Sequence, residues 1–482
     1  MEQNGKKILI KGGWIIAYNG EEHALLKDGV IVIEGNSVVY VGKNYEEPVD
    51  EVIDASSHVI SPGFISVHAH MMNSPLNKSF FEDTGSRQFG MSALYDFGAV
   101  DKAASEEDYY LSGEYSAAEM LKTGITTAVE LNRQNADMAM EIIGKSGMRG
   151  YVVPAFKSAV WYTPDGKKVH YKWDEEGGMK ELEFAIDFIE KVKGKYDGRI
   201  DSMLSPYQID TCTPELFAAA KEASERLGVR LQVHAAQSLV EFREIMERHG
   251  MTPIQWLDHL GILNDNLIIG HCIFISGHSM VGYPGDEDLE LLAASKAYVA
   301  HCPWVFARRS IILESFSRYL KAGIPIAMGN DTFPQDMINE MKMAAVASKI
   351  YDQDAVTATA REVFDAATLV GSKALDREDL GRIAPGSKAD LVFFKTNTLR
   401  MSPLRDPIKN IVYNAAGEDI EKVMVDGKMV VENGTPVHLN EEKLADSFQK
   451  TLERLWEKAP DNDREKRDMD ALSPPSIPEW KE

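Results

Sequence analysis

The sequence predicts an α/β fold, a (β/α)8 TIM barrel with a small β-sandwich domain built from both chain termini. Through the middle of the chain, apolar strand-like runs alternate with helix-length amphipathic segments, which is the pattern of parallel β/α units. Eight such runs occur, enough to close a barrel. Strand-rich stretches with polar turns lie on either side of this middle region. The 482 residues suit one large domain and one small one.

The first part of the chain is predicted to form short strands separated by polar turns. We expect strands from Ile8 to Ile16, Gly29 to Glu34, Ser37 to Gly42 and Glu51 to Asp54. Strand-rich sequence returns from Ala389 to Lys395 and from Ile420 to Glu432. Two all-β pieces at opposite ends of a chain favour one composite sandwich, which we predict over residues 1–57 and 380–440.

The barrel is predicted over residues 58–379, and a helical, Pro-rich tail over residues 441–482. A helix from Thr213 to Leu227 has Pro214 in its first turn and Gly228 just past its end. The charged tail helix, from Glu442 to Lys458, is interpreted as a surface or subunit contact. The expected barrel strands run from Val59 to His68, Ile125 to Leu131, Gly150 to Ala155, Ile200 to Ser205, Val229 to His234, Leu267 to His271, Tyr298 to His301 and Ile324 to Met328.

The composition argues against several classes of partner. Lys and Arg total 52 against 75 Asp and Glu, so the formal charge of −23 is a poor match to nucleic acid. No apolar run is long enough to cross a bilayer, and the first residues lack a signal-peptide core. Cys212, Cys272 and Cys302 form no Cys-x-x-Cys pair, which fits reduced thiols. We therefore expect a cytoplasmic protein that binds neither nucleic acid nor a membrane.

Potential metal ligands close several of the predicted strands. His68 and His70 are spaced i, i+2, so they project from one side of a strand and can hold one ion. In a barrel the chemistry sits at the carboxyl ends of the strands, where His234, His271, His301 and Asp331 also lie. One histidine at a strand end is more often a hydrogen-bonded structural residue than a ligand. The joint occurrence, from only 12 histidines in the chain, favours a metal site.

The motifs around these residues resemble the amidohydrolase superfamily, in particular its branch of guanine and thiomethyladenosine deaminases and triazine chlorohydrolases. The resemblance covers about Lys7 to Gly434 and is specific for the superfamily but much less so for substrate. The motifs are Pro62-Gly63-Phe64-Ile65-Ser66-Val67-His68-Ala69-His70, Val233-His234-Ala235-Ala236, Gly270-His271-Cys272, Ala300-His301-Cys302-Pro303 and Gly329-Asn330-Asp331-Thr332-Phe333-Pro334.

The resemblance implies one divalent metal held by His68, His70, His234 and Asp331, with zinc expected and iron as the alternative. Such an ion lowers the pKa of a bound water toward neutrality and so supplies hydroxide for attack. Asp331 would take the water proton and pass it to the leaving nitrogen. His271 would polarise the attacked C=O or C=N, although its role as ligand or catalyst stays open.

Two departures from the family pattern bear on the substrate. Family deaminases commonly carry a glutamate three residues after the fifth-strand histidine, where this chain has Gln237, and Pro206-Tyr207-Gln208 replaces Pro-His-Ala. An amide cannot accept and return a proton near neutral pH, so ring-protonating deamination loses its usual acid. We therefore expect hydrolysis of an amide, urea or carbamate C–N bond. The alternative is deamination or dechlorination of a nitrogen heterocycle such as a purine, pyrimidine or triazine.

The segment from Ala300 to Arg309, which begins at the end of the seventh strand, together with Leu313-Glu314-Ser315-Phe316, is similar to that of phenylurea and molinate hydrolases, which favours the same reading. Long aromatic loops after the first and third strands suit an apolar or aryl substrate, although local packing explains such aromatics equally well. Lys157 is the nearest candidate for the carboxylated lysine of two-metal relatives, and an ordinary lysine role is favoured. The expected substrate contacts are His301, Trp304, Arg308, Phe89 and Trp161.

Two further expectations concern assembly and activity. Related enzymes are usually dimers or larger, so by analogy we expect a homodimer or higher homo-oligomer. A non-catalytic scaffold on the same fold is a third alternative to the two enzyme readings. A scaffold should have shed metal ligands, and this chain keeps them all.

Overall fold

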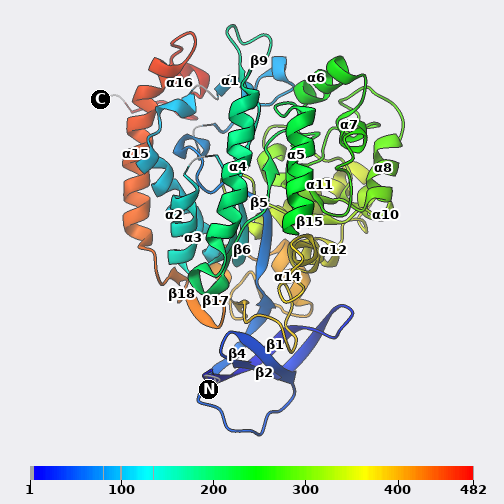
Figure 1. The fold of residues 1–482 in the computed structure, drawn as a ribbon. Coiled ribbons are helices and arrows are strands. Elements are labelled where there is room, and N and C mark those ends of the chain that lie inside the picture. The colour runs from blue at the N-terminus through cyan, green and yellow to red at the C-terminus, as the bar shows by residue number, and fades with distance from the viewer. Residues whose placement is uncertain (1–4, 80, 98–99, 134, 481–482) are drawn as a thin grey trace.

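The structure, a computed structural model, describes residues 5–79, 81–97, 100–133 and 135–480. Both ends of the chain contribute to one sheet, which lies at the bottom of Figure 1 in the order β19-β18-β17-β16-β4-β1-β2-β3. Ile10, Ile60 and Phe393, which come from both ends, are fully buried in a core that belongs to this sheet. The strands are β1 (Lys7–Tyr18), β2 (His23–Glu34), β3 (Ser37–Gly42), β4 (Glu51–Pro62), β16 (Leu391–Lys395), β17 (Ile420–Val425), β18 (Lys428–Glu432) and β19 (Thr435–Pro436).

Parallel strands form the predicted barrel. Neighbouring strands pair from β5 to β7 and from β12 to β15, and the short strands β10 and β11 pair with β7. Isolated bridges at Leu204–Leu231 and Gln208–His234 link this fourth-strand region to β12, and one at Ala69–Asp331 links the ends of the first and last strands. The predicted fold class is confirmed. The barrel strands are β5 (Phe64–Ala69), β6 (Ile125–Asn132), β7 (Arg149–Phe156), β10 (Ile200–Asp201), β11 (Ser205–Pro206), β12 (Leu231–Ala235), β13 (Leu267–His271), β14 (Tyr298–His301) and β15 (Ile326–Met328).

Helices surround the barrel. Helix α5 begins as expected, because the Thr213 side chain accepts a hydrogen bond from the Leu216 N–H as its N-cap. The longer helices are α2 (Glu106–Lys122), α3 (Ala136–Ser146), α4 (Glu175–Val192), α5 (Pro214–Leu227), α6 (Leu239–His249), α11 (Met337–Asp352) and α15 (Glu441–Asn462). The shorter ones are α1 (Leu94–Phe97), α7 (Pro253–His259), α8 (Glu287–Ser295), α9 (Pro303–Ala307), α10 (Phe316–Lys321), α12 (Ala360–Asp365), α13 (Gly371–Ala374), α14 (Pro407–Tyr413) and α16 (Met469–Leu472).

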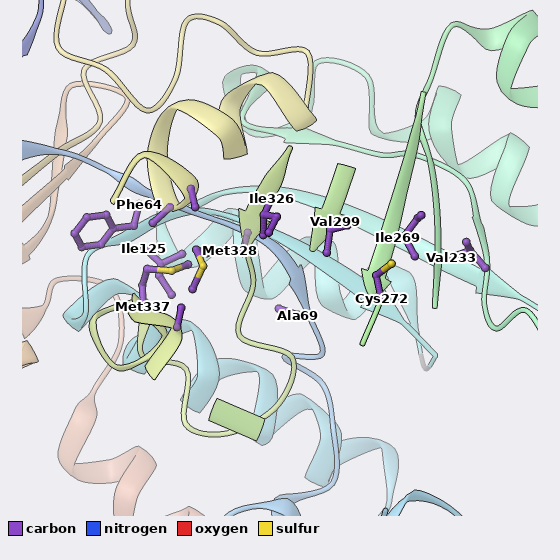
Figure 2. Packing of buried hydrophobic residues seen from close by; sticks show 14 of the residues in the cluster. Phe64, Ala69, Ile125, Val233, Ile269, Cys272, Val299, Ile326, Met328 and Met337 are labelled. Atoms are coloured by element: carbon purple, nitrogen blue, oxygen red, sulfur yellow. The ribbon is translucent and has the colours of Figure 1, made fainter. Parts of the chain in front are cut away.

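The barrel strands alternate between two cores. Val233, Ile269, Val299 and Ile326 come from the successive strands β12 to β15 and belong to the large cluster between sheet and helices (Figure 2). The residues one step along face the other way, as the pleat requires, so that Ile268 joins the cluster inside the barrel. His234 is one residue beyond Val233 and therefore points inward as well.

Two predicted barrel strands are interrupted. The run from Val59 to His68 divides at Gly63, because β4 pairs with β16 as far as Pro62 and the barrel strand β5 begins at Phe64. A Cβ at Gly63 would lie 2.0 Å from Thr126 Oγ1, so this crossing point needs glycine. The fourth strand is two short pieces, β10 and β11. The loop after β7 also carries a hairpin that the sequence did not predict, β8 (Ala159–Tyr162) and β9 (His170–Trp173).

A buried ion cluster joins the barrel to the small β-domain. Arg149, the first residue of β7, places Nε 3.1 Å from Asp390 Oδ2 and Nη2 2.9 Å from Asp426 Oδ1. All three side chains are buried, so removal of any one of them would leave a buried charge without a full set of partners. Within the described ranges, no helix is both apolar and long enough to span a membrane.

Candidate metal centre

Five predicted site residues meet at the carboxyl ends of the barrel strands, and we call them the metal centre. His70 Nε2 lies 3.7 Å from Asp331 Oδ1, and His271 Nε2 lies 3.8 Å from Asp331 Oδ2. Potential ligand atoms within 4.8 Å of one another form two groups of three. One group comes from His68, His234 and His271, and the other from His68, His70 and Asp331. All five side chains are buried. The centre comprises His68, His70, His234, His271 and Asp331.

Neighbouring oxygens orient three of the histidine rings. His70 Nδ1 lies 3.0 Å from the Leu131 carbonyl, and His234 Nδ1 lies 2.6 Å from the Tyr207 carbonyl. A carbonyl only accepts, so each Nδ1 carries the hydrogen and each Nε2 presents a lone pair. His68 Nδ1 faces Gln232 Oε1 at 3.2 Å, and the amide nitrogen of Gln232 donates to the Val67 carbonyl at 2.8 Å. The three rings therefore turn the same nitrogen toward the centre, as ligating histidines do.

The resulting donor set fits a cation. The Nε2 atoms of His70 and His234 lie 3.2 Å apart with their lone pairs facing, and His68 Nε2 is buried without a hydrogen-bond partner among the described residues. Burial lowers the pKa of His68 to about 4 and holds the pKa values of His70 and His234 well below the usual value. The rings are thus neutral at pH 7, and a divalent metal would supply the missing partner.

Asp331 and His271 complete the centre from positions of backbone strain. Both have left-handed backbone angles, with φ of 57° at Asp331 and 77° at His271. Burial raises the pKa of Asp331 to about 6, against the opposing effect of Arg309, Arg308 and Arg133. Burial also holds the pKa of His271 well below its usual value, and both ring nitrogens lack a hydrogen-bond partner within the described part of the chain. His271 can therefore act either as a ligand or as a neutral hydrogen-bonding group.

Two glycines make room for the His68 ring. A Cβ on Gly270 would lie 3.0 Å from His68 Cε1, and one on Gly329 would lie 2.8 Å from His68 Cβ. Gly270 directly precedes His271, and Gly329 stands two residues before Asp331. Their small size lets three barrel strands converge on one buried ring.

Some residues that support the centre were not singled out in the sequence. Gln232 orients His68, and the buried Glu130 carboxylate accepts hydrogen bonds from the Met71 and Met72 N–H groups just past His70. Burial raises the pKa of Glu130 to about 7. Both lie in strands that are buried along their whole length, and a polar side chain inside a buried strand is the signal that could have identified them.

A cavity of about 120 Å³ opens above the centre. It is lined by His70, His234, Asp331 and Gln237, and the Gln237 Oε1 atom is buried with no partner among the residues described. The backbone of Gln237 is held by the buried Glu241, whose Oε2 accepts its N–H at 3.1 Å. His271 does not line this cavity, but its ring meets the edge of Phe306, which does.

A second cavity of about 460 Å³ adjoins the first, because Leu94, Arg133 and Tyr207 line both. Lys157 and Trp161 line this outer cavity. Together the two spaces fall in the size range of small-molecule sites. The outer cavity also touches the segment from Asn462 to Arg464, at the C-terminal end of α15.

The predicted substrate contacts lie away from the inner cavity. Trp161 lines the outer cavity and donates Nε1–H to Asp210 at 2.9 Å. Arg308 forms an ion pair with Glu82, and the Trp304 N–H donates to Glu340. His301 and Phe89 are buried, His301 beside a separate hollow of about 10 Å³ and Phe89 against Tyr95. Their contact with substrate stays a prediction.

The comparison with known proteins identifies the family. Residues 59–430 match the Amidohydrolase family. This chain belongs to that family. It is 30% identical to a 5-methylthioadenosine/S-adenosylhomocysteine deaminase of Thermococcus sibiricus over 430 residues, 88% of this chain and 94% of that protein. A 5′-deoxyadenosine deaminase of Methanosarcina acetivorans is 26% identical over 456 residues, 94% of this chain and 99% of that protein.

Solved structures share the fold. An adenosine deaminase from Xanthomonas campestris with bound zinc has a TM-score of 0.78 at 20% identity, over 94% of this chain and 99% of that one. An atrazine chlorohydrolase from Arthrobacter aurescens TC1 complexed with zinc has a TM-score of 0.76 at 20% identity, over 92% and 100%. The superfamily and the enzyme class predicted from the sequence are confirmed: this amidohydrolase acts on carbon–nitrogen bonds other than peptide bonds.

Proposed function

We propose that this amidohydrolase is a deaminase that removes the exocyclic amino group of a 5′-modified adenosine. The observation that carries the proposal is the match, over nearly the full length of both chains, to relatives named as deaminases of such nucleosides. The sequence had favoured amides, ureas or carbamates and kept heterocycle deamination as the alternative. The relatives support that alternative better than the first choice.

The side chains of the centre suit hydrolysis. In the proposal His68, His70, His234 and Asp331 hold one divalent ion, zinc or iron, which when bound activates water and withdraws electrons. Asp331, with its pKa raised to about 6, accepts the proton of the attacking water and returns it to the departing nitrogen as ammonia leaves. His271 stays neutral and donates a hydrogen bond to the oxygen that becomes bonded to the attacked carbon and on which negative charge develops.

Gln237 is the residue that distinguishes the two candidate reactions. Its amide can donate one hydrogen bond to a ring nitrogen and accept another from an amino group, but it cannot transfer a proton near neutral pH. A purine that needs ring protonation would therefore react slowly here, whereas a carbonyl substrate needs no such step. This observation keeps hydrolysis of an amide, urea or carbamate as the second candidate.

The cavities set the expected shape of the substrate. In the proposal the reacting ring occupies the inner cavity and the 5′ substituent extends past Tyr207 into the outer one. Aromatic side chains such as Trp161 would contact the substituent. A cytoplasmic location remains part of this proposal, as does a homodimer or higher homo-oligomer by analogy with related enzymes.

A substrate comparison tests the proposal. Protein loaded with zinc, and separately with iron, is assayed for ammonia release from 5′-methylthioadenosine, S-adenosylhomocysteine and 5′-deoxyadenosine. The same preparations are assayed for cleavage of an N-aryl urea, an anilide and a carbamate. We expect ammonia release from at least one nucleoside with a kcat/KM above that for every carbonyl substrate. Cleavage of the carbonyl compounds with no ammonia release from the nucleosides would contradict the proposal and establish the second candidate.

A further inference from the structure

The C-terminal helix α15 lies beyond the family match, which ends at residue 430, and packs against the barrel beside α2 (Figure 1). Its apolar side chains recur every three or four residues and face inward, as in an amphipathic helix. The buried side chains form a stripe along most of the length of the helix. The buried members are Leu444, Phe448, Leu452, Leu455 and Ala459.

Phe448 links this helix to the metal centre through two other rings. It stacks on Tyr115 of α2 with ring centroids 4.3 Å apart, and it meets Phe333 edge to face at 5.6 Å. Tyr115 and Phe333 also touch edge to face at 5.8 Å. We call these three rings the aromatic cluster. Phe333 stands two residues after Asp331 and is 1% exposed, so it is fixed on every side by packing.

Polar contacts from α2 hold the other end of the same segment. Glu119 Oε2 accepts the Gln335 N–H at 2.9 Å, and Thr123 Oγ1 donates to the Gln335 carbonyl at 3.0 Å. The Lys78 ammonium pairs with Glu119 at 2.6 Å and lies 5.2 Å from the centroid of the Phe333 ring. Residues 331–335 are thus held by polar contacts at one end and by the aromatic cluster nearer to Asp331.

We propose that Phe448 is a positioning residue for Asp331, so that the C-terminal helix forms part of the catalytic machinery. Asp331 has a φ of 57°, a conformation that persists only where the surrounding structure enforces it. Phe448 supplies part of that enforcement by wedging Phe333 against α2. The proposal rests on the role of Asp331 as a metal ligand in the proposed function, and it holds whichever substrate the enzyme takes.

The test compares two phenylalanines that lose the same ring. In Phe448→Leu we expect a chelator to strip the metal about tenfold faster than from the wild type, the low end for loss of an outer partner. We also expect kcat to fall about tenfold with KM unchanged, since small misplacements at a reacting centre are costly. Phe188→Leu, on α4 and 1% exposed, is the control that loses core packing away from the centre. It should lower the melting temperature without changing either quantity.

A double variant tests whether Phe448 acts on Asp331 through Phe333. If Phe448 acts through Phe333, then Phe333→Leu/Phe448→Leu should lose metal no faster than Phe333→Leu alone, because coupled residues are not additive. Additive effects would place the action of Phe448 elsewhere and overturn the proposal. An unchanged rate of metal loss in folded Phe448→Leu would also overturn it. The chelator readout needs no substrate, so failure of the deaminase assignment leaves this test intact.

Discussion

The metal centre and the walls of the two cavities are built in different ways. The centre takes its side chains from strand ends that converge around His68, and the rings of His68, His70 and His234 each have a backbone or amide partner that orients them. The walls come from long loops, the β8–β9 hairpin and the C-terminal segment. The comparison indicates that strand geometry determines the chemistry, while the loops determine which molecule reaches it. Substitutions in the two regions should therefore fail in different ways.

The largest effect should follow removal of a ligand. In His234→Ala we expect loss of bound metal and a fall in kcat/KM of at least about 1,000-fold, beyond the 10- to 100-fold typical of an outer partner. The centre would lose the ring nitrogen of His234, and the remaining side chains could no longer surround an ion in the same arrangement. Metal content and activity measure the outcome. His249→Ala, a histidine stacked on Trp256 at the end of α6, is the control and should retain both. A folded His234→Ala protein that keeps its metal would show that the centre is misassigned.

The centre should also make the metal-free protein sensitive to acid. Burial lowers the pKa of His68 from 6.5 to about 4, so the unfolded chain binds more protons than the folded one between those values. The contribution of neutral His68 to the free energy of unfolding is then fully present above pH 6.5. It is lost as the pH falls toward 4 and amounts to ~3 kcal/mol for His68 alone. His70, His234 and His271 act in the same direction.

Asp331 opposes this trend, because its pKa is raised to about 6 and its protonated form favours folding as the pH falls. Glu130, Glu241 and Glu340, whose pKa values burial also raises, oppose the trend as well. The contribution of His68 is therefore isolated by urea unfolding of chelator-treated wild type and His68→Leu at pH 7 and pH 5. The wild type should lose more stability than the variant between the two values, and an equal change would mean that the His68 ring is not buried in neutral form.

Gln237 stands on the border between centre and wall, and Gln237→Glu sharpens the comparison. For a deaminase, a carboxylate here should restore ring protonation and raise ammonia release on the order of 100-fold. Metal content should stay the same, because Gln237 lines the cavity without contributing to the centre. Gln208→Glu adds the same charge to the same cavity and should give no such gain. Loss of metal from Gln237→Glu would instead make this residue part of the centre.

A smaller effect is expected from the partner of His68. Gln232→Leu removes the amide that orients the ring while keeping a side chain of similar size. Metal affinity should fall 10- to 100-fold, the usual cost of an outer partner. Competition with a chromophoric chelator measures it. Unchanged affinity would show that packing against Gly270 and Gly329 suffices to hold the ring.

The convergence of the centre residues could be predicted because its signal is local. Each candidate ligand lies at or just after the end of a short apolar run, so identifying the strands also singled out His68, His234 and Asp331. The interruption at Gly63 was missed, since the apolar run continues across it and the pairing of Pro62 with Leu391 joins distant parts of the chain. Long-range pairing of this kind leaves no local signal.

The contacts of the wall residues could not be predicted for the same reason. Arg308 was expected to meet substrate, which stays a prediction, and no local signal indicated that Glu82 pairs with it from a loop more than two hundred residues away. Phe89 packs against Tyr95 within its own loop, as local packing also allowed. Nothing in the tail sequence linked Phe448 to Phe333. The contacts of loop side chains depend on which segments lie beside them in the folded protein, and a single sequence does not reveal those neighbours.

The smallest effect should come from the wall itself. Lys157 was the candidate for a carboxylated lysine bridging two metals, and its ammonium lies 5.5 Å from the centroid of the Tyr207 ring, beside the outer cavity. Lys157→Met should leave the metal at one ion per chain and change KM by less than about tenfold, because a wall contact contributes mainly uniform binding. Metal analysis and steady-state kinetics measure the two quantities. Loss of metal together with kcat would move Lys157 into the centre and remove the distinction between centre and wall at this point.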